Sequence, residues 1–246
     1  MNIPIINLCK LLKWDSAHFK KRIALINKNT ELSIDEMSQI DHWCFENKIN
    51  CLYYLKNNEL NNNFEMKNGF TYLATRIELK KRLESILNND INENNKILFD
   101  KIERESLNKI SPEIFLRFNK TRFYRDTNFN RNLVTEMYRI WVKNHMNADN
   151  AKVIGAYMDD QIIGLITYEL SSNNIPRIGL FSVKRNSGNL GVGSQLLNKC
   201  VMDLMQKGKN SLSVVTQKSN SNALKFYLKN GFEIESTYNW FHKWYF

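Results

Sequence analysis

Two side chains near the C-terminal end of the chain belong to types that bind or protonate a small ligand. Asn220 precedes residues 221–229, whose spacing of apolar residues predicts a helix that stops at Asn230 and Gly231, and Tyr227 lies on that helix. An amide can hold a ligand by hydrogen bonds, and a phenol is protonated near neutral pH and can donate to a leaving group. Without a further signal, a tyrosine on an amphipathic helix is more often a packed core residue.

Three glycines stand upstream, before a second predicted helix at 192–206. Gly188, Gly191 and Gly193 leave the backbone bare beside a helix N-terminus, where amide hydrogens present partial positive charge to a diphosphate. The loop lacks the Gly-Lys-Ser/Thr ending of a phosphate-loop NTPase, and its glycines fall in the wrong order for a dinucleotide fingerprint. Taken alone, the loop fits a tight turn as well as it fits a ligand site.

Taken together, the two segments resemble the GCN5-related N-acetyltransferase (GNAT) family. The signature of that family is Gln/Arg-x-x-Gly-x-Gly/Ala, followed by a strand and an Asn-x-x-Ala-x-x-x-Tyr helix. Gly191 and Gly193 match the glycines of the first pattern, and Asn220, Ala223 and Tyr227 match the second.

The resemblance implies acetyl-CoA as co-substrate, no metal, and direct attack of an amine on the thioester. Tyr227 would be the general acid that protonates the departing CoA thiolate. Gly188 stands where the family usually has Gln or Arg, so the implied cradle consists of backbone without that side-chain contact. The positions implied to contact the cofactor, in strand 178–183, in the glycine loop and before the last helix, are Phe181, Val183, Asn189, Leu190, Gly191, Val192, Gly193, Ser194 and Asn220.

Segments in both halves of the chain also resemble one branch of this family, the TDP-fucosamine acetyltransferases of bacterial surface-polysaccharide synthesis, including lipopolysaccharide biosynthesis. The resembling segments are 14–16 with Phe19, 69–70, 121–126, 214–217, 220–227 and 235–237 before Trp240. The branch implies that the acceptor is the amine of a nucleotide-linked amino-deoxy sugar. The identity of the sugar and of the nucleotide, and the length of the acyl group, stay open.

The 121–126 segment is the candidate for the acceptor side of the site. Arginine pairs bidentately with phosphate, and an aromatic ring can stack on a base, so Arg122 and Arg125 are the candidate substrate-binding residues. The plain alternative is a charged surface loop.

No general base is singled out by spacing. The candidates are Asp159, Asp160, Glu169 and His242. The amine can also lose its proton to water before attack, in which case no base is needed. His242 alternates with Trp240 and Trp244 on the last predicted strand, and a histidine among core aromatics is more often a structural group.

Two functions from other classes remain alternatives. A peptide or protein N-acetyltransferase can use the same fold, since fold does not specify the acceptor. A non-catalytic binding module can use a CoA site to regulate an interaction made by residues 1–88.

The charge, cysteine and apolar content of the chain limit the kinds of ligand and partner that it can bind. The net charge of +10 is dispersed over 246 residues without a basic stretch interleaved with aromatics, and a phosphate-bearing small ligand fits this charge as well as nucleic acid does. The family resemblance implies a nucleotide-linked substrate, and no nucleic-acid partner is expected. The four cysteines have no paired spacing, so neither a disulfide framework nor a metal site is expected. We find no membrane-spanning run or signal peptide, and we expect a cytoplasmic protein; a homodimer stays open.

The catalytic segments must be positioned by a mixed sheet. The fold class expected is α/β (α+β), the GNAT fold, with a mixed central sheet flanked by helices. The polar stretch 88–95 predicts a boundary between a smaller, truncated GNAT-like N-terminal domain, 1–88, and a catalytic GNAT domain, 96–246.

Local patterns predict the individual elements. Residues 1–88 should run β-α-β-α-β, with strands at 23–26, 51–55 and 70–79, a helix capped by Ser33 that runs to about Asn47, and a short helix that ends at Gly69. The expected helix at 133–146 carries Leu133, Met137, Ile140 and Trp141 on one stripe. The remaining strands are expected at 151–157, 162–170, 178–183, 212–216, 232–236 and 240–246, with a tight turn at Asp159 and Asp160.

Overall fold

The residues that the structure describes form one mixed ten-stranded sheet flanked by helices, which confirms the predicted fold class. The computed structural model describes residues 8–57, 63–83, 97–171 and 174–246. The order of strands across the sheet is β1-β2-β3-β10-β4-β9-β8-β7-β6-β5. Within these residues, none of the helices combines the length and apolar character needed to cross a bilayer.

The bounds of the elements agree closely with the local sequence patterns. The strands are β1 Cys9–Leu11, β2 Ile23–Ile26, β3 Cys51–Asn57, β4 Thr71–Arg82, β5 Leu98–Lys101, β6 Ala151–Met158, β7 Gln161–Leu170, β8 Pro176–Val183, β9 Ser211–Gln217 and β10 Glu233–Trp244. The α-helices are α1 Lys13–Phe19, α2 Ile34–Glu46, α3 Asn63–Lys67, α4 Pro112–Leu116, α5 Arg122–Arg125, α6 Arg131–Asn147, α7 Val192–Gln206 and α8 Ser221–Lys229. The described residues also form the 3₁₀ helices η2 Arg104–Lys109 and η3 Arg185–Leu190.

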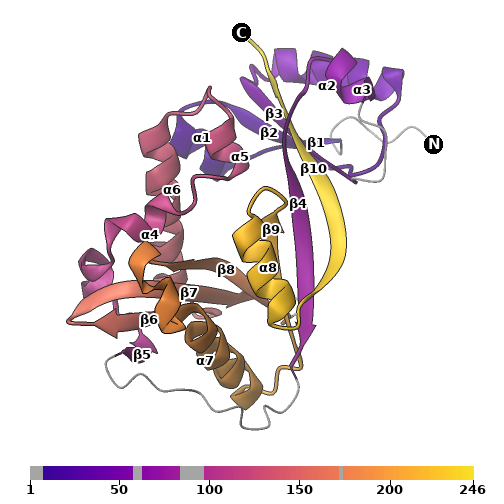
Figure 1. The fold of residues 1–246 in the computed structure, drawn as a ribbon. Coiled ribbons are helices and arrows are strands. Elements are labelled where there is room, and N and C mark those ends of the chain that lie inside the picture. Colours follow the sequence, from indigo (N-terminus) through magenta and orange to yellow (C-terminus); the bar gives the residue numbers. More distant parts are fainter. Residues whose placement is uncertain (1–7, 58–62, 84–96, 172–173) are drawn as a thin grey trace.

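Strand β4 from the N-terminal half is inserted into the C-terminal half of the sheet. It pairs antiparallel with β9 on one side, from Arg76 to Arg82, and antiparallel with β10 on the other. Strand β10 in turn pairs with β3 from Cys51 to Asn57. Figure 1 shows β4 and β10 running side by side from the part that carries α2 and α3 to the part that carries α8. The two halves of the chain therefore share one sheet.

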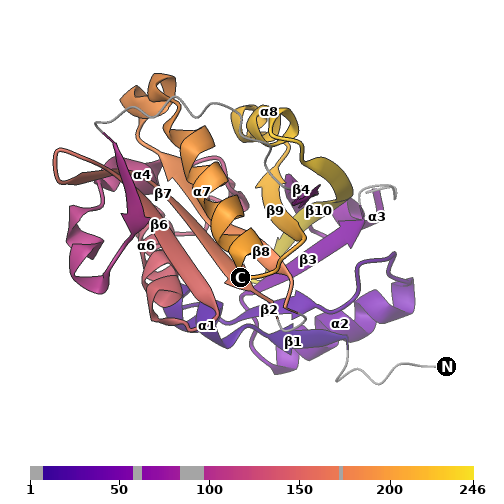
Figure 2. The same cartoon turned by 90° about the horizontal axis from the view of Figure 1, so that it is seen from below.

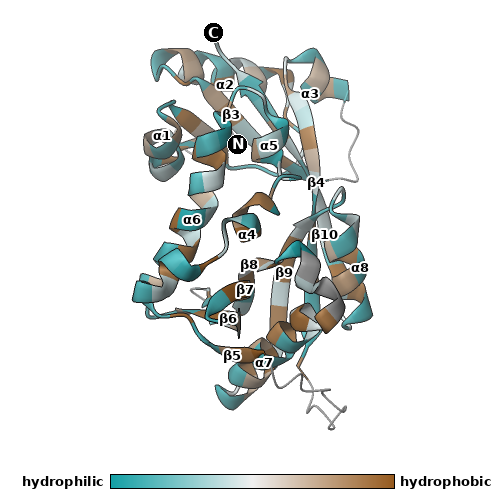
Figure 3. Ribbon diagram, turned by 60° about the vertical axis from the view of Figure 1, so that its left-hand side comes forward, coloured by the Kyte–Doolittle hydropathy of each residue, from teal (hydrophilic) through white to brown (hydrophobic). Residues whose placement is uncertain are grey.

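Hydrophobic clusters on both faces of the sheet hold the helices. Helix α7 packs on β7 from one face and α6 on β6 from the other (Figures 1 and 2). The cluster under α6 also takes in Phe19, Ile23 and Tyr53 from the N-terminal half. Hydrophilic and hydrophobic residues alternate along α6 and α7 (Figure 3), as expected of helices with one face in solvent.

Several predicted ends and turns are confirmed by their geometry. Ser33 accepts from the Glu36 amide and the Glu36 side chain accepts from the Ser33 amide, which makes a complete capping box for α2. Asp159 and Asp160 both have positive φ, 49° and 59°, as a two-residue hairpin turn of the primed type requires. Gly69 has a φ of +79° after α3, a conformation that glycine adopts without strain.

Three local predictions differ from the structure. The two closing strands expected at 232–236 and 240–246 are one strand, β10, because Asn239 lies buried in the sheet and accepts from Thr75 Oγ1 at 2.9 Å instead of making a turn. The N-terminal pattern lacked β1 and α1, which are short elements with weak periodicity. The buried residues of α6 are Val134, Met137, Tyr138 and Val142, which differ from the predicted stripe. The helix packs on β6 and also contacts α1 and α4.

The predicted boundary at 88–95 lies outside the described residues. Strand pairing nevertheless bears on how the two halves fold, because β9 and β10 both have β4 as a neighbour.

We predict that a fragment of residues 97–246 does not fold on its own. The fragment loses β4 from between β9 and β10 and the N-terminal side chains of the shared cluster. Burial of each such large side chain contributes about 2 kcal/mol, and the stability of a whole domain is only about 5 to 15 kcal/mol. Thermal unfolding followed by circular dichroism should show a cooperative transition for the full chain and none for the fragment. A sharp transition in the fragment would contradict the prediction.

Candidate active site

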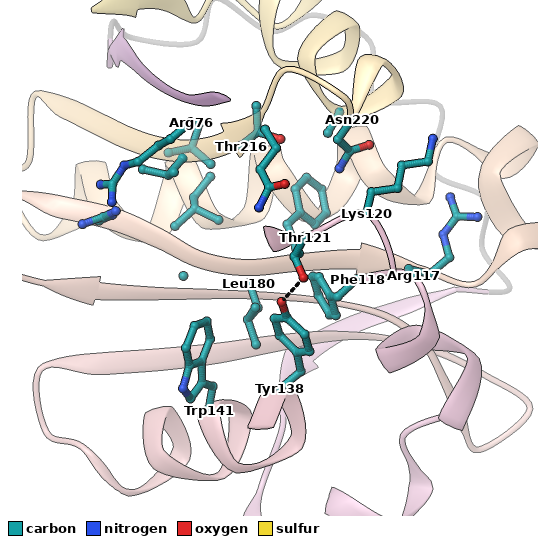
Figure 4. A pocket seen from close by; sticks show the side chains of 18 of the residues that line it. Arg76, Arg117, Phe118, Lys120, Thr121, Tyr138, Trp141, Leu180, Thr216 and Asn220 are labelled. Carbon is teal, nitrogen blue, oxygen red and sulfur yellow. Dashed lines mark hydrogen bonds between the residues drawn. The ribbon is translucent and has the colours of Figure 1, made fainter. Parts of the chain in front are cut away.

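A cavity of about 660 Å³ lies where strands β8 and β9 separate. Its lining comes from the residues before and in α5, from α6, from β8 and β9, and from the start of α8. Figure 4 shows Tyr138 and Trp141 of α6 on one side of the cavity, Arg76, Thr216 and Asn220 on the other, and Leu180 of β8 between them. Residues of helices on both faces of the sheet thus line the cavity.

The separation of the two strands is a feature of their pairing. The parallel pair β8–β9 has only two register positions, Arg177 with Ser213 and Ile178 with Val214. Strand β9 remains in the sheet because β4 pairs with its other edge. On the far side, β8 stays paired with β7 as far as Val183. The edge of β8 that faces β9 is therefore open beyond Ile178.

A bulge in β8 begins where this edge opens. The register steps from Tyr168 with Ile178 to Ile166 with Phe181, so β8 contains one extra residue. The Leu180 amide donates to Thr167 Oγ1 at 2.8 Å, which fixes the bulge to β7.

The amides of Phe181 and Val183 point toward the open edge. The Lys184 amide donates to the Ile163 carbonyl of β7 at 2.7 Å. Successive peptide groups of a strand point to opposite edges, so the Val183 and Phe181 amides face away from β7. These two groups are donors placed along a gap in the sheet, as a pantetheine arm would need.

The glycine loop joins β8 to α7 by a tight turn. Gly191 has a φ of +69° and stands between η3 and α7. The bare Gly193 faces Phe226, whose Cε2 would be 3.5 Å from an added Cβ. The amides of Val192, Gly193 and Ser194 begin α7, where no preceding turn can accept from them. This arrangement fits a diphosphate, as the sequence implied. Asn189 and Leu190 lie in the same turn, and Leu190 is outside the cavity lining.

Tyr227 lines the cavity from α8. Its side chain is 5% exposed and packs against Phe226 and Phe232, with ring centroids 5.6 and 5.3 Å away. Burial raises the pKa of the phenol well above its ordinary value, so the group stays protonated at neutral pH. Within the described part of the chain, its hydroxyl has no hydrogen-bond partner, which leaves the proton available to a ligand.

Asn220 lies at the N-terminal end of α8 and also lines the cavity. Its side chain makes no capping bond to the helix, although asparagine often does at this position. The side-chain amide therefore does not bond to the backbone at the start of α8.

Arg122 lines the cavity and is held in an aromatic cage. Its guanidinium carbon lies 4.3 Å from the ring centre of Tyr53 and 4.0 Å from those of Phe123 and Trp240. Its backbone is tied to β9 by Gln217: with the amide oriented to satisfy both ends, Gln217 accepts from the Arg122 amide at 3.0 Å. The structure does not bring Arg125 to the same place, since Arg125 donates to the Leu73 carbonyl at 3.0 Å and lies outside the lining.

His242 is a buried structural group that connects Arg122 to Asp126. Asp126 Oδ2 lies 2.6 Å from His242 Nδ1 and accepts from Trp244 Nε1 at 2.9 Å, while Arg122 Nη1 lies 2.6 Å from His242 Nε2. An arginine can only donate and a carboxylate only accept, so the ring is neutral with its proton on Nδ1. Burial lowers its pKa to about 4, although Asp126 opposes that shift. The burial of this histidine and the partners of both ring nitrogens agree with the interpretation that it is structural.

The same histidine belongs to a cluster with metal-ligand atoms. One atom each of Cys51, Asp126 and His242 lie within 4.8 Å of one another. Nε2 of the histidine accepts from Arg122, and the Asp126 carboxylate accepts from His242 and Trp244. Burial raises the pKa of the Cys51 thiol, which therefore stays protonated. This donor set does not suit a metal ion.

Of the other base candidates, only Glu169 lies at the cavity. Asp159 and Asp160 form the β6–β7 turn and are absent from the lining. Glu169 Oε2 lies 3.4 Å from Nε2 of His145 on α6, and both residues line the cavity. Sequence reasoning missed His145, although its spacing of one turn after Trp141 on α6 placed both on one helix face. It also missed the lining cations, which come from three segments: Arg76, the neighbouring Arg117 and Lys120, and Arg177.

Comparison with known proteins identifies the segment that forms most of this site. Residues 121–239 match the model of the acetyltransferase (GNAT) domain. Residues 121–239 form a GNAT acetyltransferase domain. This match confirms the resemblance seen in the sequence.

Similar proteins agree with this assignment. The chain is 28% identical over 108 residues to a dTDP-fucosamine acetyltransferase of Escherichia coli, covering 43% of this chain and 46% of that protein. It is 25% identical over 127 residues to the spore coat polysaccharide biosynthesis protein SpsD of Bacillus subtilis, covering 52% of this chain and 44% of that protein. The chain thus spans less than half the length of these relatives.

A solved structure supports the fold. A GCN5-related N-acetyltransferase from Sphaerobacter thermophilus superposes with a TM-score of 0.66 at 12% identity, covering 96% of this chain and 76% of that one. At this identity the likeness shows the fold alone. It extends over the N-terminal half as well as the GNAT domain.

We predict that His242 makes the stability of the protein fall between about pH 6.5 and pH 4. A histidine whose pKa is lower in the folded state than in the unfolded state, where it is near 6.5, stabilises the fold fully above pH 6.5 and loses that effect as the pH falls to about 4. The difference corresponds to about 3 kcal/mol in the free energy of unfolding. Urea unfolding over this range should show a shallower pH dependence for His242→Gln than for the wild type.

The exposed His42 provides the control. His42→Gln should keep the wild-type pH dependence. Equal slopes for His242→Gln and the wild type would show that His242 is not the group that titrates.

Proposed function

We propose that this protein transfers an acetyl group from acetyl-CoA to the amine of a nucleotide-linked amino-deoxy sugar of the TDP-fucosamine type, by direct attack, in the cytoplasm and for surface-polysaccharide synthesis. The relatives named above support the substrate class. The observation that carries the proposal within this chain is the charge of the cavity.

The cavity is lined by more cations than anions, although Arg76 is paired with Glu78 of the same strand. The cationic side chains are Arg76, Arg117, Lys120, Arg122 and Arg177. Among the described residues of the lining, Glu169 alone carries a carboxylate. Arg117, Lys120 and Arg177 form no ion pair within the described ranges. Such a cavity favours an acceptor that carries phosphate groups, whereas a peptide amine would need an acidic or extended groove.

Aromatic side chains offer a second kind of contact. Phe118 and Tyr138 stack with ring centroids 4.5 Å apart, and Trp141 stands edge-on to Tyr138 at 5.5 Å. All three line the cavity. A flat ring in a cationic cavity is suited to stack on a nucleotide base.

The chemistry we propose uses the open edge of β8. The amides of Phe181 and Val183 would pair with the pantetheine arm, the start of α7 would hold the diphosphate, and Asn220 would contact the cofactor. The acceptor nitrogen attacks the thioester carbon, an N–C bond forms, and the C–S bond breaks. Tyr227 gives its proton to the departing sulfur and recovers one from the nitrogen that was acylated.

We predict that Tyr227→Phe lowers kcat by about 100-fold or more, because the sulfur then departs without a proton. The ring and its packing remain, so the Kd for acetyl-CoA measured by calorimetry should change little. Tyr157→Phe is the matched control, since the Tyr157 hydroxyl contacts the Lys101 carbonyl outside the cavity. A non-catalytic CoA-binding module would show no turnover in either protein, and an unchanged kcat in Tyr227→Phe would remove the tyrosine from the mechanism.

We predict that mass spectrometry of reactions with acetyl-CoA and a panel of amines will show one added acetyl unit on TDP-linked amino-deoxy sugars. Arg177→Gln should raise the KM for that acceptor about tenfold or more with a smaller effect on kcat, because it removes a cation from the phosphate side of the cavity. Arg104→Gln, on an exposed turn of η2, is the control. Acetylation of peptides but not of sugar nucleotides would support the peptide acetyltransferase alternative instead.

A further inference from the structure

His145 of α6 lines the cavity, and one of its ring nitrogens has no hydrogen-bond partner among the described residues. Nδ1 of His145 is buried and makes no hydrogen bond within the structure described. A buried polar atom left without a partner costs about 1 to 3 kcal/mol, so such atoms in native proteins call for an explanation. The other nitrogen, Nε2, lies 3.4 Å from Glu169 Oε2.

The contact of Nε2 with Glu169 determines which ring nitrogen carries the proton and which one can accept a proton. The Glu169 carboxylate can only accept, so the ring proton belongs on Nε2 and the lone pair on Nδ1. This is the arrangement in which a carboxylate orients an imidazole to receive a proton at its other nitrogen.

The ring lies against the bulge in β8. A Cβ added to Gly179 would collide with His145 Cε1 and would lie 3.3 Å from Nδ1. Gly179 is exposed and lines the cavity, and it is two residues before Phe181 on the open edge of β8. Nδ1 therefore lies beside the backbone of β8 where its open edge begins. The absence of a side chain at Gly179 is what leaves room for the imidazole.

The position of His145 complements that of Tyr227. His145 comes from α6 on one face of the sheet and Tyr227 from α8 on the other, and both line the cavity in the gap between β8 and β9. An acetyl transfer needs a proton acceptor on the side of the attacking nitrogen and a proton donor on the side of the departing sulfur.

We propose that His145, oriented by Glu169, is the general base that takes the proton from the ammonium group of the acceptor. This inference rests on the proposed acetyl transfer. The ammonium loses one proton to Nδ1, the free amine attacks the thioester, and the imidazolium later releases that proton to solvent. The second proton leaves the nitrogen as the tetrahedral intermediate collapses and replaces the one that Tyr227 has given to sulfur.

The surroundings keep the imidazole neutral. Burial lowers the pKa of His145, and Glu169 acts in the opposite direction. The other charged groups of the neighbouring strands at this cavity are Arg177, opposite Glu169 in the β7–β8 ladder, and Arg76 on β4. A neutral imidazole at pH 7 is the form that can accept a proton.

The first experiment measures kcat/KM for dTDP-4-amino-4,6-dideoxygalactose from about pH 5 to pH 9. We expect His145→Gln to lower kcat/KM at pH 7 by about 100-fold, with recovery as the pH rises and the amine loses its proton to water. Glu169→Gln should move the acidic limb of the profile to lower pH, because it removes the group that raises the pKa of His145. His42→Gln, on the exposed face of α2, should match the wild type.

A purely structural role would not move the pH profile, so it is separated from the base by that readout and by thermal unfolding of each variant. If His145→Gln keeps kcat/KM within about threefold of the wild type with the same profile, the proposal is overturned. If that variant does not fold, the unmoved limb of Glu169→Gln overturns it instead.

The second experiment needs no acceptor. Nitrogen-15 NMR of the histidine rings in the wild type should show His145 neutral at pH 7 with its proton on Nε2, and a proton on Nδ1 or a charged ring would overturn the proposal. A wild type that acetylates no sugar nucleotide but shows this ring state would contradict the proposed acceptor and leave the assignment of the base standing.

Discussion

The site depends on the divergence of β8 from β9. Two parallel neighbours that stayed paired along their length would satisfy each other's backbone groups and leave no room for a ligand. Here the pairing stops after Ile178 and Val214, and the sheet remains intact because β4 holds β9 and β7 holds β8. The gap supplies free amides, a cavity, and access for side chains from both faces.

This constraint explains why the N-terminal half is part of the architecture of the cavity. Strand β4 occupies the place beside β9 that must be filled for β9 to leave β8. Tyr53 of β3 forms one wall of the cage around Arg122, and Arg76 of β4 lines the cavity. The matched GNAT domain, 121–239, contains neither residue. Differences in the N-terminal half among similar proteins would therefore be expected to alter the acceptor side of the cavity.

Most of the local structure could be predicted from sequence because it rests on short-range chemistry. The capping box of α2, the acidic hairpin turn and the amphipathic helices α7 and α8 each depend on residues close together in the chain. The positions of the glycine loop, Asn220 and Tyr227 followed from a family pattern that also lies in one segment. Their roles in binding and catalysis stay predictions.

The features that could not be predicted from the sequence depend on pairing between segments far apart in the chain. Nothing local in residues 71–82 indicates insertion between β9 and β10, and nothing in Arg76, Arg177 or His145 alone indicates that they meet. Arg122 and Arg125 looked equivalent in sequence, yet one enters the cavity and the other bonds to Leu73, because a single turn of α5 points them to different neighbours. Backbone amide NMR of the wild type as CoA is added tests most directly whether the open edge of β8 binds the cofactor. We expect the largest shift changes at Phe181, Val183 and the first turn of α7. Binding that leaves the β8 amides unchanged, or no binding, would show that this edge is not the cofactor site.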